Sequence, residues 1–286
     1  MLLEGDLGDH FSYTAYTQLL SAEPSELYAT TGRSDAANWL KIATMSYSLG
    51  DFTLSLGKNY MFIGTWEEDP YDHESHWDYN SIFWNYFQVY QWGGDLTYDI
   101  NDSAYASLQV TGSPFTVHPF DDGLLSYTAF CTAEADDVSA RISGHLVGIE
   151  PHRYMKMLAG GGLYTFGNFT IGVDSMLRQF DTGKDYETTS ILSLCWAPSE
   201  RFDITAKAIY EEVHGAVMPE TFTQIYERMP DTYYSGNERL FGGIAAHYRP
   251  LKDTDALRLH AVVTHMPFMG GVSINIGALY NFTINL

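Results

Sequence analysis

The sequence predicts an all-β fold, an antiparallel up-and-down β-barrel that crosses a membrane as one domain over residues 1–286. Three observations predict it. Segments of about ten to sixteen residues alternate apolar and polar side chains, as strands with two different faces do. Short polar turns and longer loops alternate along the chain, as in a meander of hairpins. Aromatic residues recur beside the short turns, where a barrel carries them at the membrane surface.

The composition narrows the class of protein further. No run of about eighteen apolar residues occurs, so a transmembrane helix is excluded. Aromatic residues make up 15% of the chain and 25 residues are glycine, a mixture that suits twisted strands. The formal net charge of −21 argues against a nucleic-acid partner, because phosphate binding needs clustered Lys and Arg.

Motifs for cofactors are absent from the sequence. It contains no phosphate-binding glycine loop, no paired CxxC and no HExxH, so we expect neither a cofactor nor a metal. Cys131 and Cys195 lie in separate strand segments. We expect two independent thiols there, with one disulfide as the alternative.

Fifteen segments are expected to form strands, in chain order. They are residues 1–5, 9–21, 37–48, 51–62, 83–100, 103–114, 123–135, 138–149, 153–166, 168–180, 187–197, 201–213, 237–249, 255–265 and 271–286. Short turns such as 50–51 and 136–137 alternate with longer connections such as 63–82 and 214–236. This alternation predicts neighbouring antiparallel strands with all short turns at one end.

Several segments alternate cleanly between the two kinds of side chain. In residues 201–210 the apolar face carries Phe202, Ile204, Ala206, Ala208 and Tyr210, and the other face carries Arg201, Asp203, Thr205 and Lys207. Residues 138–149 and 255–265 behave alike, whereas residues 37–48 fit poorly. The last segment places Val272, Ile274, Ile276, Ala278, Tyr280, Phe282, Ile284 and Leu286 on one face. Each such strand has one apolar and one polar side.

The positions of the aromatic side chains indicate that lipid contacts the apolar side of the sheet. Those that come just before a short turn are Tyr47, Tyr98, Tyr164, Phe166, Trp196 and Tyr248, and those just after one are Phe52, Phe169 and Phe202. Rings at one height on successive hairpins are typical of a membrane–water interface. A soluble β-sandwich, whose strand ends also carry aromatic residues, is the alternative.

Closure of the sheet bears on the strand count. A lipid-exposed sheet tolerates no open edge, and bacterial barrels have even strand numbers. The odd count, together with a start that lacks a secretory signal, predicts a sixteen-stranded barrel whose first strand is missing before Met1. The alternative treats residues 1–8 as a plug or tail and closes fourteen strands. Tyr280, Phe282 and Ile284, spaced by two near the C-terminus, resemble the signal that bacterial barrel-assembly machinery reads.

A family resemblance lies in residues 51–91, DFTLSLGKNYMFIGTWEEDPYDHESHWDYNSIFWNYFQVYQ. The motifs LxLGKNxxxIG and SxFWN, with an acidic and aromatic loop between them, resemble outer-membrane porins of Bacteroidetes, distant members of the phosphate-selective porin O/P family. LEGDLGDHFSY near the N-terminus is similar to that family's early hairpin. The resemblance implies a sixteen-stranded trimer in the Gram-negative outer membrane that passes small solutes by diffusion. Phosphate selectivity does not carry over, because 15 Lys and Arg face 36 Asp and Glu.

The loop at residues 63–82 is the candidate constriction. With a first strand restored it becomes the third external loop, which folds into the lumen in general porins. Its carboxylates, without Lys or Arg among them, are Glu67, Glu68, Asp69, Asp72, Glu74 and Asp78. Inside a lumen they would attract cations and repel anions. A solvated external loop is the alternative.

Charged and histidine side chains on the polar faces are the candidate pore lining: Arg141, His145, Asp174, Arg178, Asp203, Lys207, Arg258 and His260. Structural ion pairs within the barrel wall are the alternative. The sequence thus favours a non-enzymatic channel for small hydrophilic solutes or ions. Its expected partners are outer-membrane lipid and lipopolysaccharide, the barrel-assembly machinery and two further copies in a homotrimer.

Two other functions stay open. One is a lipase- or protease-type barrel enzyme, with bases among His145, His214, His247, His260 and His265, although no Ser-His-Asp spacing is evident. The other is a soluble sugar-binding protein that uses Tyr226, Tyr233 and Tyr234.

Overall fold

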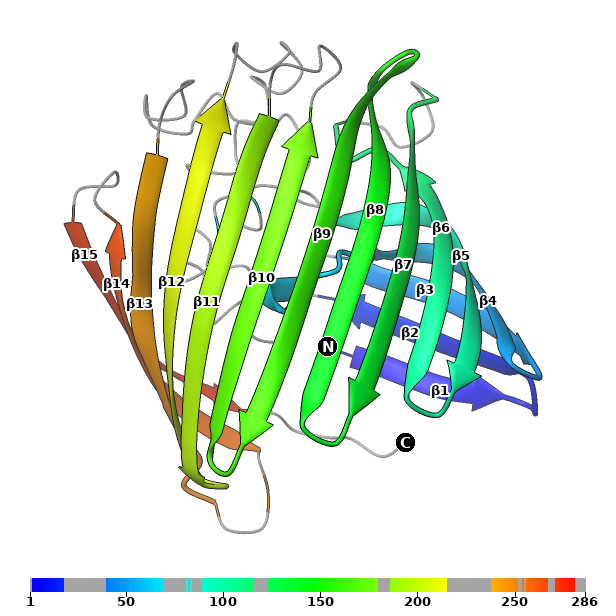
Figure 1. The fold of residues 1–286 in the computed structure, drawn as a ribbon. Helices are drawn as coiled ribbons and strands as arrows, with labels where there is room; N and C mark the ends of the chain where they lie inside the picture. The colour runs from blue at the N-terminus through cyan, green and yellow to red at the C-terminus, as the bar shows by residue number, and fades with distance from the viewer. Residues whose placement is uncertain are drawn as a thin grey trace.

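The computed structural model describes residues 2–17, 40–68, 81, 83, 89–115, 123–179, 186–214, 238–251, 254, 256–266 and 271–280. These residues form one sheet of fifteen strands that follow each other in sequence order, each antiparallel to the next. The sheet curves round on itself, with the short turns at its lower end in Figure 1. No helix among the described residues is long and apolar enough to cross a membrane.

The strands are β1 (Leu2–Leu7), β2 (Phe11–Thr17), β3 (Leu40–Leu49), β4 (Phe52–Tyr60), β5 (Tyr90–Asn101), β6 (Ala104–Gly112), β7 (Leu125–Ala135), β8 (Val138–Glu150), β9 (Arg153–Phe166), β10 (Phe169–Gln179), β11 (Tyr186–Ser199), β12 (Phe202–His214), β13 (Glu238–Tyr248), β14 (Leu257–Met266) and β15 (Gly271–Tyr280). A single 3-10 turn, η1, covers Trp66–Glu68.

All fifteen expected segments contain a strand, which confirms the predicted meander. The fourteen-strand alternative is wrong, because β1 pairs with β2 along its whole length. The expected segment 83–100 was too long, since its strand begins at Tyr90 and Phe83 belongs to the buried core. A sixteenth strand does not occur among the described residues, and the last six residues of the expected C-terminal strand lie outside them.

Hairpin geometry follows from the residues in the short turns. Gly50 and Gly167 each stand first in a two-residue turn, with φ of 58° and 55°. Such turns need a residue with positive φ, which glycine adopts without a steric penalty.

The outer face of the sheet is apolar and exposed. Leu259 is 40% and Ile274 is 67% exposed, and no second sheet among the described residues covers them. The soluble sandwich, which would bury these side chains, is therefore wrong. At the short-turn end aromatic rings touch across strands, as Phe52 and Tyr98 do with centroids 4.8 Å apart. Phe169 lies 5.5 Å from Phe166 and 6.4 Å from Trp196 in a stacked row. An apolar band edged by such rings suits a lipid bilayer.

The buried core lies on the opposite, inner face. Its members on the wall are Val147, Ile149, Met155, Met157, Ala159, Met176, Ile191, Ile209 and Phe241, from β8 to β13. Met61, Ile63, Phe83 and Phe115, from connections between strands, pack against them. Chain from the connections thus packs against the inner face of β8 to β13.

Candidate functional site

The segment Met61–Glu68 leaves β4 and lies against the inner face of β8, β9 and β10. Gly64 makes the closest approach. A Cβ at this position would lie 2.5 Å from the main-chain nitrogen of Ser143 and 2.8 Å from the carbonyl oxygen of Ala159. Only glycine therefore lets the segment rest directly on the strand backbones. The N–H of Gly64 donates to Ser143 Oγ at 2.7 Å, which fixes the segment to β8.

Trp66 packs on the inner wall at a second position that depends on glycine. Gly161 on β9 pairs with Arg141 on β8 and with Asp174 on β10, so these three residues form one row across the inner face. The ring of Trp66 lies over Gly161, where a Cβ would be 3.0 Å from its Cδ1 atom. The main-chain N–H of Trp66 donates a hydrogen bond to Asp174 Oδ1 at 2.9 Å. The guanidinium of Arg141 lies 3.7 Å from the ring centroid, a cation–π contact.

The side chain of Glu67 links both ends of the connection between β4 and β5 to the inner wall of the barrel. Its Oε1 atom accepts the N–H of Ser81 at 2.5 Å and lies 3.7 Å from Nζ of Lys207 on β12. The carboxylate is almost completely buried, with 1% of its side chain exposed. Lys207 thus provides the positive charge that such a burial requires.

Arg178 on β10 organises the next part of the wall. Its Nε donates to Glu187 Oε2 at 3.1 Å, and its terminal nitrogen donates to Thr189 Oγ1 at 2.9 Å. Thr189 in turn donates to Glu211, and Glu211 accepts the N–H of Phe83 at 3.4 Å. The guanidinium also lies 4.5 Å from the Phe83 ring centroid. This network connects Phe83 to three strands.

The inner wall from β2 to β8 differs in chemistry. Direct strand partners form a row that we call the polar belt: Ser12, Ser46, Ser55, Asp95, Gln109, Thr128 and His145. Gln109 accepts a hydrogen bond from the main-chain N–H of Phe62 at 3.1 Å and donates one to the carbonyl oxygen of Tyr60 at 3.0 Å. It therefore holds the start of the inserted segment. Asp95 and Gln109 were not among the residues predicted to line the pore. Their inward alternation in β5 and β6 was the available signal.

Three of the eight predicted lining residues contact the inserted segment, namely Arg141, Asp174 and Lys207. A fourth, Arg178, contacts Phe83 instead. Asp203 lies elsewhere, where its two oxygens each lie 2.7 Å from a nitrogen of His247 or Arg249. Arg258 and His260 lie on β14, where His260 pairs with His247.

The predicted loop carboxylates are only partly placed. Glu67 contacts the wall and Glu68 ends η1, whereas Asp69, Asp72, Glu74 and Asp78 lie outside the described residues. In the described part of the chain, no three His, Cys, Asp or Glu side chains are grouped to hold a metal.

His145 carries the arrangement nearest to a catalytic pair. Its Nε2 atom lies 2.6 Å from Ser143 Oγ, but its Nδ1 atom contacts Thr128 rather than a carboxylate. Ser143 Oγ also receives the Gly64 N–H. A serine nucleophile needs a histidine oriented by an acid and free access to substrate, and this serine lies under the inserted segment. The pair instead holds main chain in place.

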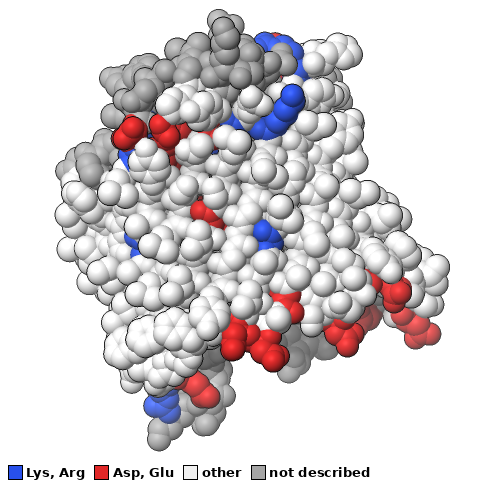
Figure 2. Space-filling model, in the orientation of Figure 1, with Lys and Arg blue, Asp and Glu red and all other residues white. Residues whose placement is uncertain are grey.

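The short-turn end carries a rim of acidic side chains, which gather along the lower edge of the molecule in Figure 2. Asp51, Asp99, Asp102 and Glu134 line a groove of about 580 Å³ there. They are solvent-exposed, so we expect them to attract cations at a distance set by the ionic strength. We call these four residues the acidic rim.

Comparison with known proteins supports the fold. No family model matches the sequence, and no curated protein matches it. Among solved structures, an OmpT loop-deletion variant, an outer membrane protein of Vibrio cholerae, superposes with a TM-score of 0.60 at 12% identity, over 98% of this chain and 88% of that one. A porin refined at 1.8 Å gives 0.58 at 10% identity, over 98% and 90%. A variant of the Rhodopseudomonas blastica porin gives 0.57 at 15% identity, over 98% and 88%. The shared fold, with the exposed apolar face, indicates an outer-membrane barrel.

Proposed function

We propose that the chain is a porin-like channel that lets small hydrophilic solutes or ions diffuse across the outer membrane. The observation that carries the proposal is the segment 61–68, fixed inside a barrel of porin fold by main-chain bonds to Ser143 and Asp174. A segment in this position narrows the lumen of a barrel but does not form an enclosed substrate-binding site. No catalytic activity is part of the proposal, because the described Ser–His pair lacks an acid and access.

The finer features of the channel rest on separate support. The inserted segment is proposed to be the constriction, with the acidic residues of 63–82 other than Glu67 giving it a preference for cations. Glu67 is buried and lies beside Lys207, so it holds the segment rather than facing solutes. A homotrimer is proposed because one of the similar OmpT structures is described as a trimer form. Membership among Bacteroidetes porins of the phosphate-selective porin O/P family is proposed on the LSLGKNYMFIG and SIFWN motifs, the acidic and aromatic loop between them and the N-terminal LEGDLGDHFSY. Lipopolysaccharide and the barrel-assembly machinery are the proposed further partners.

Planar bilayer recordings test the proposal. Purified, folded protein should produce stepwise, ohmic conductance and should let small sugars swell liposomes. Heat-denatured protein at the same concentration is the matched control. Folded protein that gives neither conductance nor swelling would rule out a diffusion channel. Labelling of the intact protein by a serine-reactive probe, lost on Ser143→Ala, would favour a barrel enzyme instead.

A further inference from the structure

The groove at the short-turn end contains an aromatic ring besides its carboxylates. Tyr105 on β6 lines it next to the acidic rim. Asp99 on β5 and Thr132 on β7 are the direct strand partners of Tyr105, so the three residues form a row across the inner face. The next partner in this row is Arg141, which lies against Trp66 of the inserted segment. The row thus connects the groove to the residues that hold the proposed constriction.

Tyr105 packs against a chain of rings. Its ring centroid lies 5.8 Å from that of Phe130 on β7, and the ring of Phe130 lies 5.6 Å from that of Phe62 in the inserted segment. Phe130 is only 4% exposed, whereas Tyr105 is half-buried and lines the groove. A ring fixed in this way offers a flat apolar surface to a solute, and little side-chain entropy remains to be lost on binding.

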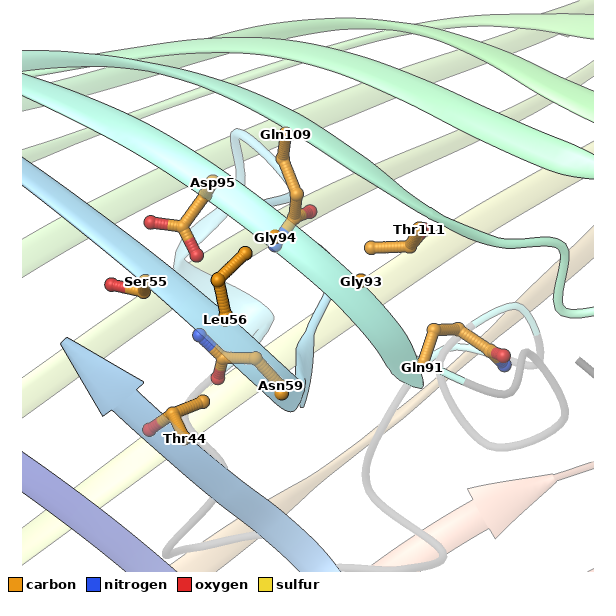
Figure 3. A pocket seen from close by; sticks show the side chains of 11 residues that line it. Thr44, Ser55, Leu56, Asn59, Gln91, Gly93, Gly94, Asp95, Gln109 and Thr111 are labelled. Carbon is orange, nitrogen blue, oxygen red and sulfur yellow. The ribbon is translucent and has the colours of Figure 1, made fainter.

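The accessible polar groups of this wall are gathered in the same groove. Among the described residues on the inner face of β5, β6 and β7, the exposed side chains are Asp99, Asn101 and Glu134. The polar belt differs, because Asp95 and Gln109 are only 6% and 2% exposed. Figure 3 shows these two side chains on neighbouring strands of the wall. A solute in the lumen therefore meets hydrogen-bonding groups in the groove rather than in this part of the belt.

The groups of the groove can both accept and donate hydrogen bonds. Asp99 and Glu134 are acceptors, and neither forms an ion pair in the described part of the chain. Asn101 accepts the main-chain N–H of Ser103 through its Oδ1 atom at 2.8 Å, which leaves its NH2 group as a donor. No described residue that lines the groove is Lys or Arg. The groove therefore disfavours anions and suits a neutral molecule with both donors and acceptors.

We propose that this groove binds a neutral pyranose sugar, with one face of the sugar on the Tyr105 ring and its hydroxyl groups bonded to Asp99 and Glu134. The proposal rests on the proposed channel function and names the class of solute. A pyranose has an apolar face of C–H groups and a rim of hydroxyl groups, which matches a ring surrounded by carboxylates and an amide. The groove of about 580 Å³ lies within the range of about 300–1,000 Å³ for small-molecule sites. An organic ammonium ion fits less well, because it has no acceptor for the NH2 group of Asn101.

Saturation-transfer-difference NMR tests the site, with maltose as the probe and the folded protein in a detergent without a sugar headgroup. Wild-type protein should transfer saturation to the ring protons of maltose. Potassium chloride at about 1 M should leave the transfer unchanged, because a neutral sugar has no charge to screen. Tyr105→Ala should abolish the transfer, and Tyr105→Phe, which keeps the ring, should retain it. Tyr98→Ala removes a ring from the lipid-facing side of the same hairpin and is the matched control.

Each result decides for or against the groove as a sugar site. Folded wild-type protein that transfers no saturation to maltose would overturn the proposal, even if no Tyr105 variant folds. Transfer that persists in Tyr105→Ala would place the sugar elsewhere and overturn it as well. Transfer to tetramethylammonium but not to maltose would indicate a cation site instead. Binding and conductance are separate readouts. Protein that conducts without binding maltose contradicts only the sugar site, and protein that binds maltose without conducting contradicts only the channel.

Discussion

The indole ring of Trp66 lies over Gly161, with the guanidinium of Arg141 3.7 Å from the ring centroid and the carboxylate of Asp174 accepting the main-chain N–H of Trp66. These wall residues belong to three adjacent strands and are brought into one row by strand register. The row therefore acts as a seat for the inserted segment. The absence of a side chain at Gly161 is as necessary for holding Trp66 as the charges of Arg141 and Asp174 beside it.

Filling this seat should release the segment. In Gly161→Val the new side chain would meet Asp174 Oδ1 and Cδ1 of Trp66, so the ring must leave. We expect the folded variant to lose about 1.5–3 kcal/mol of stability, the range for a hydrogen bond to a charged group. Single-channel conductance should rise. Gly144→Val on β8 is the matched control, because nothing lies within 4 Å of its Cβ position. Equal conductance in the two variants would mean that the segment does not limit the passage.

The buried ion pair of Arg178 and Glu187 should be sensitive to loss of either partner. The two side chains are only 2% and 3% exposed. Arg178→Met leaves a buried carboxylate behind, which typically costs about 3–5 kcal/mol. Arg153→Met breaks the Arg153–Glu150 pair, whose side chains are 37% and 39% exposed, and should cost at most about 1 kcal/mol. Thermal unfolding in detergent measures both. Similar losses in the two variants would contradict the buried network.

Local patterns were sufficient to predict the two faces of the sheet. Side chains on a strand alternate with a period of two, so the apolar face could be assigned from residues such as Leu259 or Ile274 without knowing the neighbouring strand. The rows of aromatic rings at the short-turn end were equally predictable, because the turns mark the level of the membrane surface.

The row of Arg141, Gly161 and Asp174 and the polar belt were not predictable in the same way. Both depend on which residues become partners across strands, and register depends on turn lengths and strand tilt along the whole sheet. Gly161 stands in a run of three glycines, and only Gly161 faces the inserted ring. Asp95 is an ordinary alternating residue of β5 until Ser55 and Gln109 are placed beside it. The start of β5 was misplaced because the aromatic residues after Ser81 have the composition of a strand.

Charge on the outer face should be poorly tolerated. Ile276 lies near the middle of β15 and is 78% exposed on the apolar side. Ile276→Arg should destabilise the protein in lipid vesicles by about 2–4 kcal/mol, the cost of arginine near the bilayer midplane. Asn275→Arg, one residue earlier on the other face, is the control and should cost much less. Urea unfolding in vesicles measures the difference, and a similar cost for both would contradict a lipid-facing side.

The acidic rim should influence ion preference in a way that depends on salt. Replacing Asp51, Asp99 and Asp102 by Asn and Glu134 by Gln removes four exposed negative charges from one mouth. We expect the cation-to-anion permeability ratio, taken from reversal potentials across a potassium chloride gradient, to fall in dilute salt. In concentrated salt the variant should match wild type, because the screening length shrinks from about 10 Å at 0.1 M to about 3 Å at 1 M. A difference that persists unchanged at 1 M would show that the substitutions altered the passage itself rather than its long-range field.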